Sequence, residues 1–122
     1  MKIGTITRSM SKPTEGFTFR REGYEIYISY IEPNSIKEIE TDDLKEYEYM
    51  QYNYYGAIST YEELVNKSVL LKYSIEEELS LMAKAIIDQK EPKYIAYRNF
   101  VELCKSSCKD NYIILGLTKN DN

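Results

Sequence analysis

The 122-residue sequence predicts an α+β fold, with an antiparallel sheet of four or five strands and two main helices packed on one face. Residues 17–32 alternate apolar and polar side chains as β-hairpins do, and residues 46–59 are rich in tyrosine, which favours strands. Two later segments show helix starts followed by apolar residues at helical spacing. With a hydrophobic content of 43%, the chain is expected to form a single domain over residues 1–122.

The first elements expected along the chain are a strand and a loop. Residues 2–8 alternate apolar and polar side chains, which predicts a short strand. Residues 9–16 contain Pro13 and Gly16 and are expected to form a loop that leads into the hairpin.

The hairpin at residues 17–32 is expected to turn at Glu22 and Gly23, because glycine adopts the positive φ that two-residue turns need. In that register Arg20 lies opposite Glu25, which makes an opposite-charge pair across the strands. Side chains alternate along a strand, so one face of the hairpin becomes apolar. That face carries Phe17, Phe19, Tyr24, Ile26, Ile28 and Tyr30.

Two segments follow the hairpin. Residues 36–43 are expected to form a polar connection with at most one helical turn, because apolar residues are sparse there although Ser35 and Glu38 fit a capping box. Residues 46–59 are expected to form one long strand or a second hairpin. In an extended chain one face carries Tyr47, Tyr49 and Tyr55, and the other carries Met50, Tyr52 and Tyr54.

Two capping boxes mark helices. Thr60 with Glu63 opens a short helix at residues 61–66, and Ser74 with Glu77 opens a longer helix that ends near residue 89. Apolar residues in the longer helix recur at spacings of four, three and four, so we expect them to face the core. This expected buried stripe is Ile75, Leu79, Met82 and Ile86.

The last third of the sequence predicts one more helix and one strand. Pro92 suits the first position of a helix, and the short connection before it predicts an antiparallel helix pair. Cys104 and Cys108 fall on one face of this helix; we interpret them as small buried residues, with a redox pair as the alternative. Residues 112–117 form a continuous apolar run, which predicts a strand buried on both faces.

The composition excludes several kinds of chemistry. Histidine is absent, which excludes Ser-His and Cys-His nucleophilic pairs and histidine metal ligands. The five glycines are scattered and form no phosphate-binding loop. We therefore expect no enzymatic activity, no catalytic residue, no metal and no cofactor. No apolar run approaches the ~20 residues that span a bilayer and no signal region is present, so a cytoplasmic protein without a membrane partner is expected.

The net charge of −4 is concentrated in one segment. Residues 32–48 hold seven acidic residues and two lysines, whereas residues 1–31 carry a net charge of +2. The overall sign argues against direct nucleic-acid binding. Acidic residues beside tyrosines suit a basic protein surface, because charge steers association and tyrosine supplies contact area. The predicted partner-binding residues are Glu38, Glu40, Asp42, Asp43, Glu46, Tyr47, Glu48, Tyr49 and Tyr52.

A second candidate surface lies at the hairpin tip. Arginine can hold a phosphate and aromatic rings can stack a base, so this surface suits a small anionic nucleotide. Its predicted ligand-binding residues are Arg20, Arg21, Tyr24 and Tyr27.

These observations lead to two hypotheses about function. Small size, acidic charge and the amino-acid bias of AT-rich coding are typical of proteins encoded by phages and mobile elements. We expect a non-enzymatic binding protein that neutralises a partner protein, as anti-defence inhibitors and immunity proteins do. The alternative is a sponge that sequesters a small nucleotide signal. A homodimer is also expected, because the tyrosine-rich strand offers more aromatic surface than one small sheet can cover.

Overall fold

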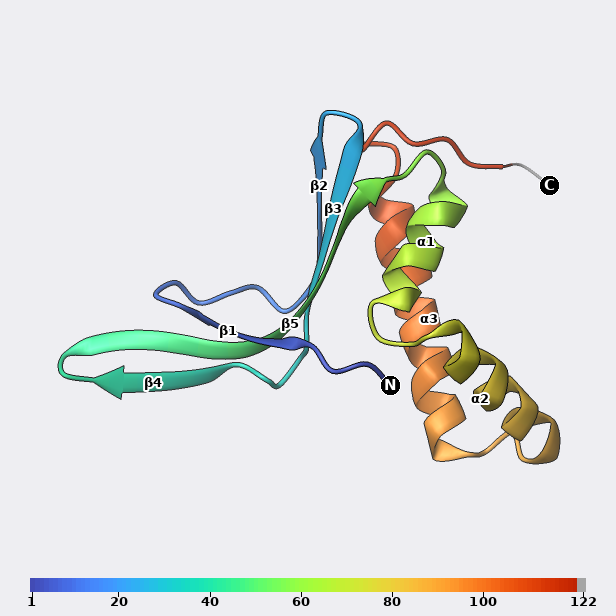
Figure 1. Ribbon diagram of the computed structural model, residues 1–122, viewed down its shortest axis with the longest axis horizontal. Coiled ribbons are helices and arrows are strands. Elements are labelled where there is room, and N and C mark those ends of the chain that lie inside the picture. The colour runs from blue at the N-terminus through green and yellow to red at the C-terminus, as the bar shows by residue number, and fades with distance from the viewer. Residues whose placement is uncertain (121–122) are drawn as a thin grey trace. The chain divides into compact units, whose positions relative to one another are not determined.

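The computed structural model describes residues 1–120 and shows a five-stranded antiparallel sheet and three helices (Figure 1). The predicted α+β fold class is therefore confirmed. The chain divides into two compact units, of which Ile3–Gly56 holds the five strands except for Ala57, the last residue of β5. Met1–Lys2 and the chain from Ala57 onward hold the three helices. The expectation of a single domain over residues 1–122 stays a prediction.

Strand β5 (Leu44–Ala57) is the central element of the sheet unit. Strand β1 (Thr5–Ser9) pairs with residues 47–51 of β5, and β4 (Lys37–Thr41) pairs with residues 44–48. Strand β3 (Glu25–Ile31) also neighbours β5, and β2 (Gly16–Glu22) pairs with β3. The tyrosine-rich segment at residues 46–59 was predicted to form either one long strand or a second hairpin, and it lies almost entirely in the one long strand β5.

The prediction of a polar connection at residues 36–43 was wrong, because residues 37–41 form strand β4. Asp42 and Asp43 turn the chain from β4 into β5 with φ values of +45° and +67°. Thr41 pairs with Leu44 across this turn, so the two aspartates are the central residues of a type I′ hairpin turn. Aspartate tolerates the left-handed conformation better than most residues, which explains a hairpin at a site without glycine.

The β2–β3 hairpin forms as predicted, but its predicted register was wrong. The turn lies at Gly23 and Tyr24 rather than at Glu22 and Gly23, with Gly23 at φ +62°. A positive φ at the first central position alone suits a type II′ turn. Each residue of β2 therefore pairs two positions further along β3, and Arg20 lies opposite Tyr27 instead of Glu25. A shift of two positions leaves the side chains of the paired residues on their predicted faces, whereas Tyr24, predicted on the apolar face, lies in the turn and is exposed.

The helices begin where their caps predict. Helix α1 is Tyr61–Leu70, α2 is Ile75–Ile87 and α3 is Pro92–Asn111, and α3 packs against both of the others (Figure 1). The Thr60 side chain accepts a hydrogen bond from the backbone of Glu63, and Ser74 and Glu77 form a complete capping box. Within residues 1–120, no helix combines the length and the hydropathy needed to cross a membrane.

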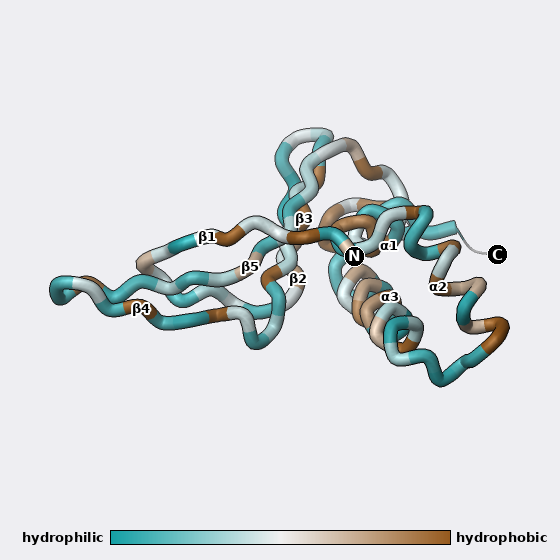
Figure 2. Tube along the Cα trace, turned by 60° about the horizontal axis from the view of Figure 1, so that its bottom comes forward, coloured by the Kyte–Doolittle hydropathy of each residue, from teal (hydrophilic) through white to brown (hydrophobic). Residues whose placement is uncertain are grey.

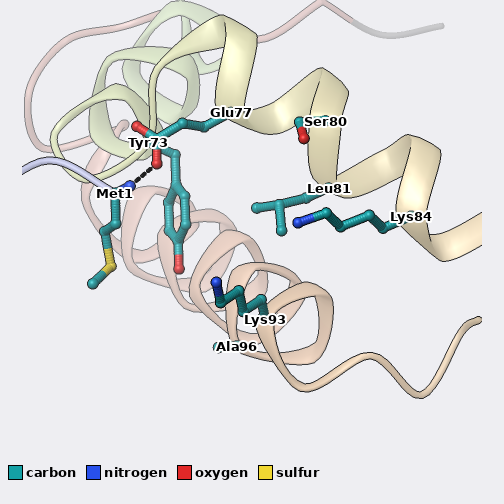
Figure 3. A pocket seen from close by; sticks show the side chains of 8 residues that line it. All are labelled: Met1, Tyr73, Glu77, Ser80, Leu81, Lys84, Lys93 and Ala96. Atoms are coloured by element: carbon teal, nitrogen blue, oxygen red, sulfur yellow. Dashed lines mark ion pairs between the residues drawn. The ribbon is translucent and has the colours of Figure 1, made fainter.

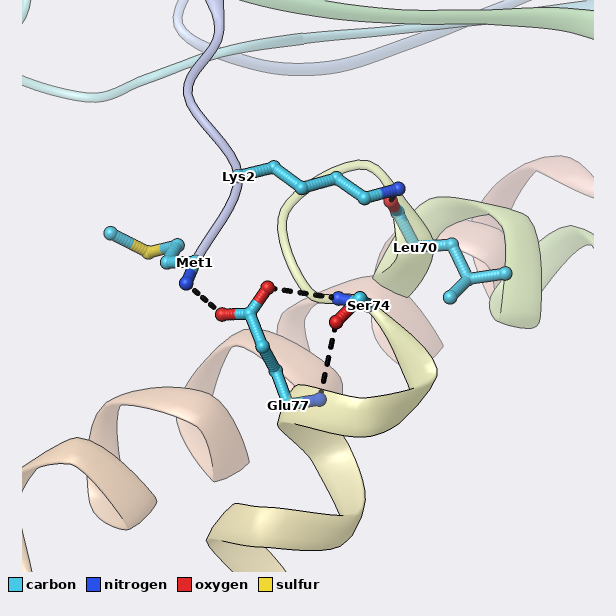
Figure 4. A network of polar contacts seen from close by, with 5 residues as sticks. All are labelled: Met1, Lys2, Leu70, Ser74 and Glu77. Carbon is cyan, nitrogen blue, oxygen red and sulfur yellow. Dashed lines mark hydrogen bonds and ion pairs between the residues drawn. The ribbon is translucent and has the colours of Figure 1, made fainter.

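The first two residues of the chain belong to the helical unit (Figure 4). The Lys2 Nζ donates a 2.7 Å hydrogen bond to the carbonyl of Leu70 at the end of α1. A cation there compensates carbonyl groups that the helix leaves without partners. The amino group of Met1 forms an ion pair with Glu77, whose carboxylate also accepts a hydrogen bond from the backbone of Ser74. These contacts join the start of the chain to both helix termini.

The prediction of a strand at residues 112–117 was wrong. After α3 the chain forms a turn with Gly116 at φ +75°, in which Leu115 and Leu117 are buried and Ile113 and Ile114 are exposed. Beyond the turn, Thr118 forms a parallel bridge with Thr60, so the chain returns beside the start of α1. Within residues 1–120 the continuous apolar run has no strand partner along its length. Two of its residues complete the helical core instead.

Cys104 and Cys108 lie in the core of the helical unit, with no solvent exposure and as free thiols. The buried Ser68 of α1 hydrogen-bonds its own helix at the carbonyl of Leu64, and its hydroxyl lies 3.6 Å from the Sγ of Cys108. Burial raises the pKa of Cys108 to about 11 and raises that of Cys104 further. The interpretation of the two cysteines as buried apolar residues is therefore confirmed.

The predicted buried stripe of α2 was wrong. Ile75, Leu79, Met82 and Ile86 are 49–87% exposed, and Leu81 is the buried residue of the helix. Helix α2 faces α3 with a different side, on which Glu78 accepts a hydrogen bond from the Tyr97 hydroxyl. The apolar stripe of α2 is consequently not part of the core that the structure describes.

Candidate functional site

The β4–β5 hairpin brings together most of the predicted partner-binding residues. Residues 37–48, which we call the acidic ribbon, hold six carboxylates and two lysines, a net charge of −4. Figure 1 shows the ribbon as a two-stranded hairpin formed by β4 and the first part of β5. Glu38 and Glu40 lie on β4, and Asp42 and Asp43 form the turn. The β5 part carries Glu46, Tyr47 and Glu48.

Two of the six carboxylates are neutralised within the sheet. The Nζ of Lys45 lies 2.9 Å from Glu38, whose hydrogen bond raises the pKa of the lysine. The guanidinium of Arg8 lies 3.1 Å from Glu48, its direct neighbour across the β1–β5 pair. In the described part of the chain, the other four carboxylates have no ion-pair or hydrogen-bond partner. These four are Glu40, Asp42, Asp43 and Glu46.

One of the four unpaired carboxylates, Glu46, shares a face of the ribbon with apolar side chains, whereas Glu40 lies on the opposite face. Residues directly opposite in an antiparallel pair share a face, so Ile39, Glu46 and Leu44 lie on the same side of the ribbon. Leu44 is 52% exposed. In Figure 2 one brown, apolar segment interrupts the teal, hydrophilic course of β4. Ile6 of β1, opposite Met50, is a further exposed apolar residue of this face.

Sequence reasoning missed Ile6, Ile39 and Leu44 as contact residues. The signal was present for Ile39 and Leu44. Across a two-residue turn at Asp42 and Asp43, residues of the two strands that stand an odd number of positions apart share a face, as these two do. No signal in the sequence placed Ile6 beside them, since β1 pairs with a strand about forty residues away along the chain.

Tyr49 and Tyr52, which were predicted to supply contact area, are only 8% and 6% exposed. Their burial results from the central position of β5, which has neighbouring strands along its length. Burial also raises the pKa of Tyr52, whose ring lies 6.2 Å from that of Tyr30. The aromatic contact role therefore falls to the half-buried Tyr47 alone, and Leu44 provides the largest exposed apolar surface of the ribbon.

The second predicted surface is not assembled as expected. Arg20 and Tyr27 are direct cross-strand neighbours, with the guanidinium 4.9 Å from the centre of the ring. Arg21 lies on the opposite face of the hairpin, and Tyr24 lies in the turn. The four predicted ligand-binding residues therefore do not face one ligand.

Carboxylates also surround Arg20. Its Nη2 lies 2.7 Å from the carboxylate of Glu22, which opposes Glu25 across the hairpin. A hydrogen bond to Glu25 raises the pKa of Tyr55 to about 12. One arginine beside two carboxylates leaves a local excess of negative charge, which disfavours an anionic nucleotide at this place.

A pocket of about 370 Å³ lies between α2 and α3, within the helical unit. Tyr73, Leu81 and Ala96 contribute to its apolar wall. Figure 3 shows Lys84 extending from α2 and Lys93 from α3 toward the space beside the Tyr73 ring. Across residues 1–120, neither ammonium group has an ion-pair or hydrogen-bond partner. The sequence carried no signal for this pocket, because the two lysines belong to different helices.

Within residues 1–120 no three side chains of the types that ligate metals are grouped to hold a metal ion. Comparisons with family models, with curated proteins and with solved structures found no match to this chain. The protein is therefore classified by its structure alone, as an α+β protein with an acidic, partly apolar hairpin.

Proposed function

We propose that this protein is a non-enzymatic, cytoplasmic binding protein that neutralises a partner protein by occupying a basic surface with the acidic ribbon. Anti-defence inhibitors and immunity proteins of phages and mobile elements act in this general way. The observation that supports the proposal is the group of four unpaired carboxylates on one short hairpin that also carries the exposed Leu44 and the half-buried Ile39. A surface of this kind offers charge for steering and apolar area for affinity.

The unpaired carboxylates and the apolar residues have different effects on binding. Long-range attraction between the ribbon and a basic surface raises the association rate and weakens with salt. Burial of Leu44 and Ile39 in the complex slows dissociation, since most affinity differences between related complexes lie in the dissociation rate. The type I′ turn holds the two aspartates in one backbone conformation before binding, which lowers the entropy cost of association.

The test is a charge-neutral ribbon that keeps its shape. Lysine at positions 42 and 43 would disfavour the left-handed turn, whereas asparagine tolerates it. The variant therefore combines Glu40→Gln, Asp42→Asn, Asp43→Asn and Glu46→Gln. A partner captured by the wild-type protein from host lysate, identified and then purified, is expected to associate with this variant at least about tenfold more slowly at low salt. Its association rate should also depend less on salt.

A matched control removes four charges elsewhere. Glu76→Gln, Asp88→Asn, Glu102→Gln and Asp110→Asn all lie at exposed positions of the helical unit. This control should associate at nearly the wild-type rate. Leu44→Ala should speed dissociation and leave the association rate almost unchanged. Equal slowing by the ribbon variant and by the control would contradict a specific role for the ribbon.

A second candidate function, the binding of a small anion, is supported by the pocket between α2 and α3 rather than by Arg20. Two unpaired ammonium groups converge on an apolar wall, which suits an anion that carries an apolar or aromatic body. Adenosine monophosphate and octanoate are suitable probes, since they share an anionic group and differ in the rest of the molecule. A rise in melting temperature with one of them would identify the kind of body that the pocket accepts.

The control for this second candidate uses lysines of the same helix. Lys93→Met should abolish the rise in melting temperature, whereas Lys109→Met, at an exposed position of α3, should preserve it. Loss of the effect in both variants, or in Arg20→Ala instead, would argue against the pocket.

A further inference from the structure

The apolar stripe of α2 has a symmetry that points to its occupant. Ile75, Leu79, Met82 and Ile86 are exposed, and Figure 2 shows apolar segments recurring along α2. Their spacings of four, three and four residues read the same from either end of the helix. An exposed stripe of this kind is an interaction surface rather than an ordinary solvent face, because single scattered apolar residues do not align at helical spacing.

We infer that α2 binds a second copy of this chain, with the two α2 helices packed antiparallel about a twofold axis. A twofold interface uses the same patch on both subunits, so residue i contacts residue j and residue j contacts residue i. When two copies of α2 are aligned antiparallel about the centre of the stripe, Ile75 meets Ile86 and Leu79 meets Met82. The palindromic spacing therefore makes the stripe complementary to itself.

The charges beside the stripe favour the same arrangement. Glu76 and Glu78 flank the stripe on opposite sides near the N-terminus of α2, and Ala83 and Ala85 flank it one heptad later. In the antiparallel pair the same flanks face each other, so Glu76 lies opposite Ala83. In a parallel pair opposite flanks face each other, which brings Glu76 of one copy to the flank of the other on which α3 packs and Glu78 accepts the Tyr97 hydrogen bond. The antiparallel copy is the one that avoids carboxylate opposite carboxylate.

This interface differs from the one that the tyrosine-rich strand suggests. Tyr49 and Tyr52 are buried, so the aromatic surface that motivated a homodimer is small. Helix α2 belongs to the other compact unit and does not include the acidic ribbon. The inferred dimer is thus independent of the proposed function, and each copy would retain its own ribbon. A single pair of short helices buries little area, so the dimer is expected to be weak and to depend on concentration.

The first experiment measures mass by sedimentation or light scattering over a roughly hundredfold range of protein concentration. The wild-type mass should rise toward twice the monomer mass. Leu79→Glu should remain a monomer throughout, because a charge on the stripe meets apolar side chains of the other copy. Ile113→Glu, at an exposed apolar residue outside α2, should dimerise as the wild type does. A wild-type protein that stays monomeric over the whole range would overturn the inference.

The second experiment tests orientation and also separates other occupants. Leu79→Cys mixed with Met82→Cys should form mainly the mixed disulfide under mild oxidation, since the native cysteines are buried. Dominant cross-links between two copies of Leu79→Cys would show a parallel pair and contradict the arrangement. The melting temperature of Leu79→Glu should match that of the dilute wild-type monomer. A clear loss of stability in that monomer would mean that another part of this chain covers the stripe, which would also overturn the inference.

Discussion

Burial determines the chemistry of individual side chains in the helical unit. Cys104 and Cys108 lie four residues apart on one helix face, and their complete burial raises both pKa values and leaves the thiolate form scarce at neutral pH. The thiolate is the reactive form of cysteine. The same burial makes Ser68 hydrogen-bond its own helix, because a hydroxyl without a partner is costly in the core.

Both thiols should therefore be unreactive in the native protein. A thiol reagent at pH 8 is expected to modify neither cysteine on the timescale on which it modifies an introduced surface thiol, Ser106→Cys. In denaturant without reductant, two thiols per chain should react. Rapid modification of the native wild type would show that one of the two sites opens to solvent.

Leu64 and Leu79 differ in burial, so truncating each side chain tests whether it belongs to the core. Leu64 has no solvent exposure, so Leu64→Ala should lower the free energy of unfolding by roughly 2–5 kcal/mol. Leu79 lies on the exposed stripe, so Leu79→Ala should change it by less than about 0.5 kcal/mol in dilute protein. Urea unfolding of both variants and the wild type measures the difference. Equal destabilisation would show that the stripe is buried in solution.

The β4–β5 turn is the element whose local sequence is least suited to its conformation. Type I′ turns prefer Asn-Gly or Asp-Gly, whereas this turn has two aspartates, both with positive φ. The second position carries a Cβ where glycine would be free of strain. The adjacent carboxylates also repel each other, and neither has a partner in the described part of the chain.

Asp43→Gly is therefore expected to stabilise the hairpin by up to about 1 kcal/mol, through relief of the left-handed backbone. Asp43→Asn removes the charge and keeps the Cβ, so it separates charge repulsion from backbone strain. Asp43→Val should destabilise the hairpin, since β-branched residues rarely adopt positive φ. Amide hydrogen exchange of residues in β4 measures the three effects. Stabilisation by asparagine equal to that by glycine would assign the whole effect to charge.

Local sequence signals predicted where the helices begin. The predictions that were wrong concern contacts between segments distant in the sequence, which local signals do not determine. Helix starts are marked by groups that deal with the unpaired backbone N–H groups of the first turn. The side chains of Thr60 and Ser74 accept hydrogen bonds from such groups, and Pro92 has no backbone N–H to be satisfied. Residues 112–117 have strand composition, but no strand of the described chain pairs along them. The stripe of α2 shows which face of a helix is apolar, and it does not show which neighbour covers that face.

The candidate site was predicted in part for the same reason. The acidic residues follow directly from the sequence, and the structure brings six of them onto one hairpin. The burial of Tyr49 and Tyr52 follows from the strands beside β5, and the exposure of Leu44 follows from its place next to the turn. Neither can be read from the tyrosine-rich segment alone.

At the scale of the whole molecule, the absence of histidine shapes the response to pH. No side chain has an ordinary pKa between about 5 and 8, so titration of the side chains should change stability little from pH 6 to pH 8. Burial raises the pKa of Tyr97 to about 12 and that of Cys108 to about 11. A raised pKa means that the folded state favours the neutral form, so this stability is present below pH 9 and is lost as pH rises through about 12.

The protein should therefore lose stability between about pH 9 and pH 12, and ionisation of Tyr97 should cause part of that loss. Tyr97→Phe removes that part, so the decline in its melting temperature over this interval should be shallower than that of the wild type. Tyr24→Phe, at a turn residue that is 90% exposed, should follow the wild-type curve. Identical curves for all three proteins would mean that Tyr97 ionises in the folded state without cost.

Strand β5 also imposes an order on folding. The β2–β3 and β4–β5 hairpins close over short loops, whereas β1 pairs with residues about forty positions further along the chain. During synthesis β1 must therefore wait until β5 has left the ribosome, because its partner does not yet exist. In that interval β1 is an unpaired edge with an exposed Ile6, which is the condition under which strands join other chains. The nascent protein is consequently most vulnerable to aggregation just before its central strand is complete.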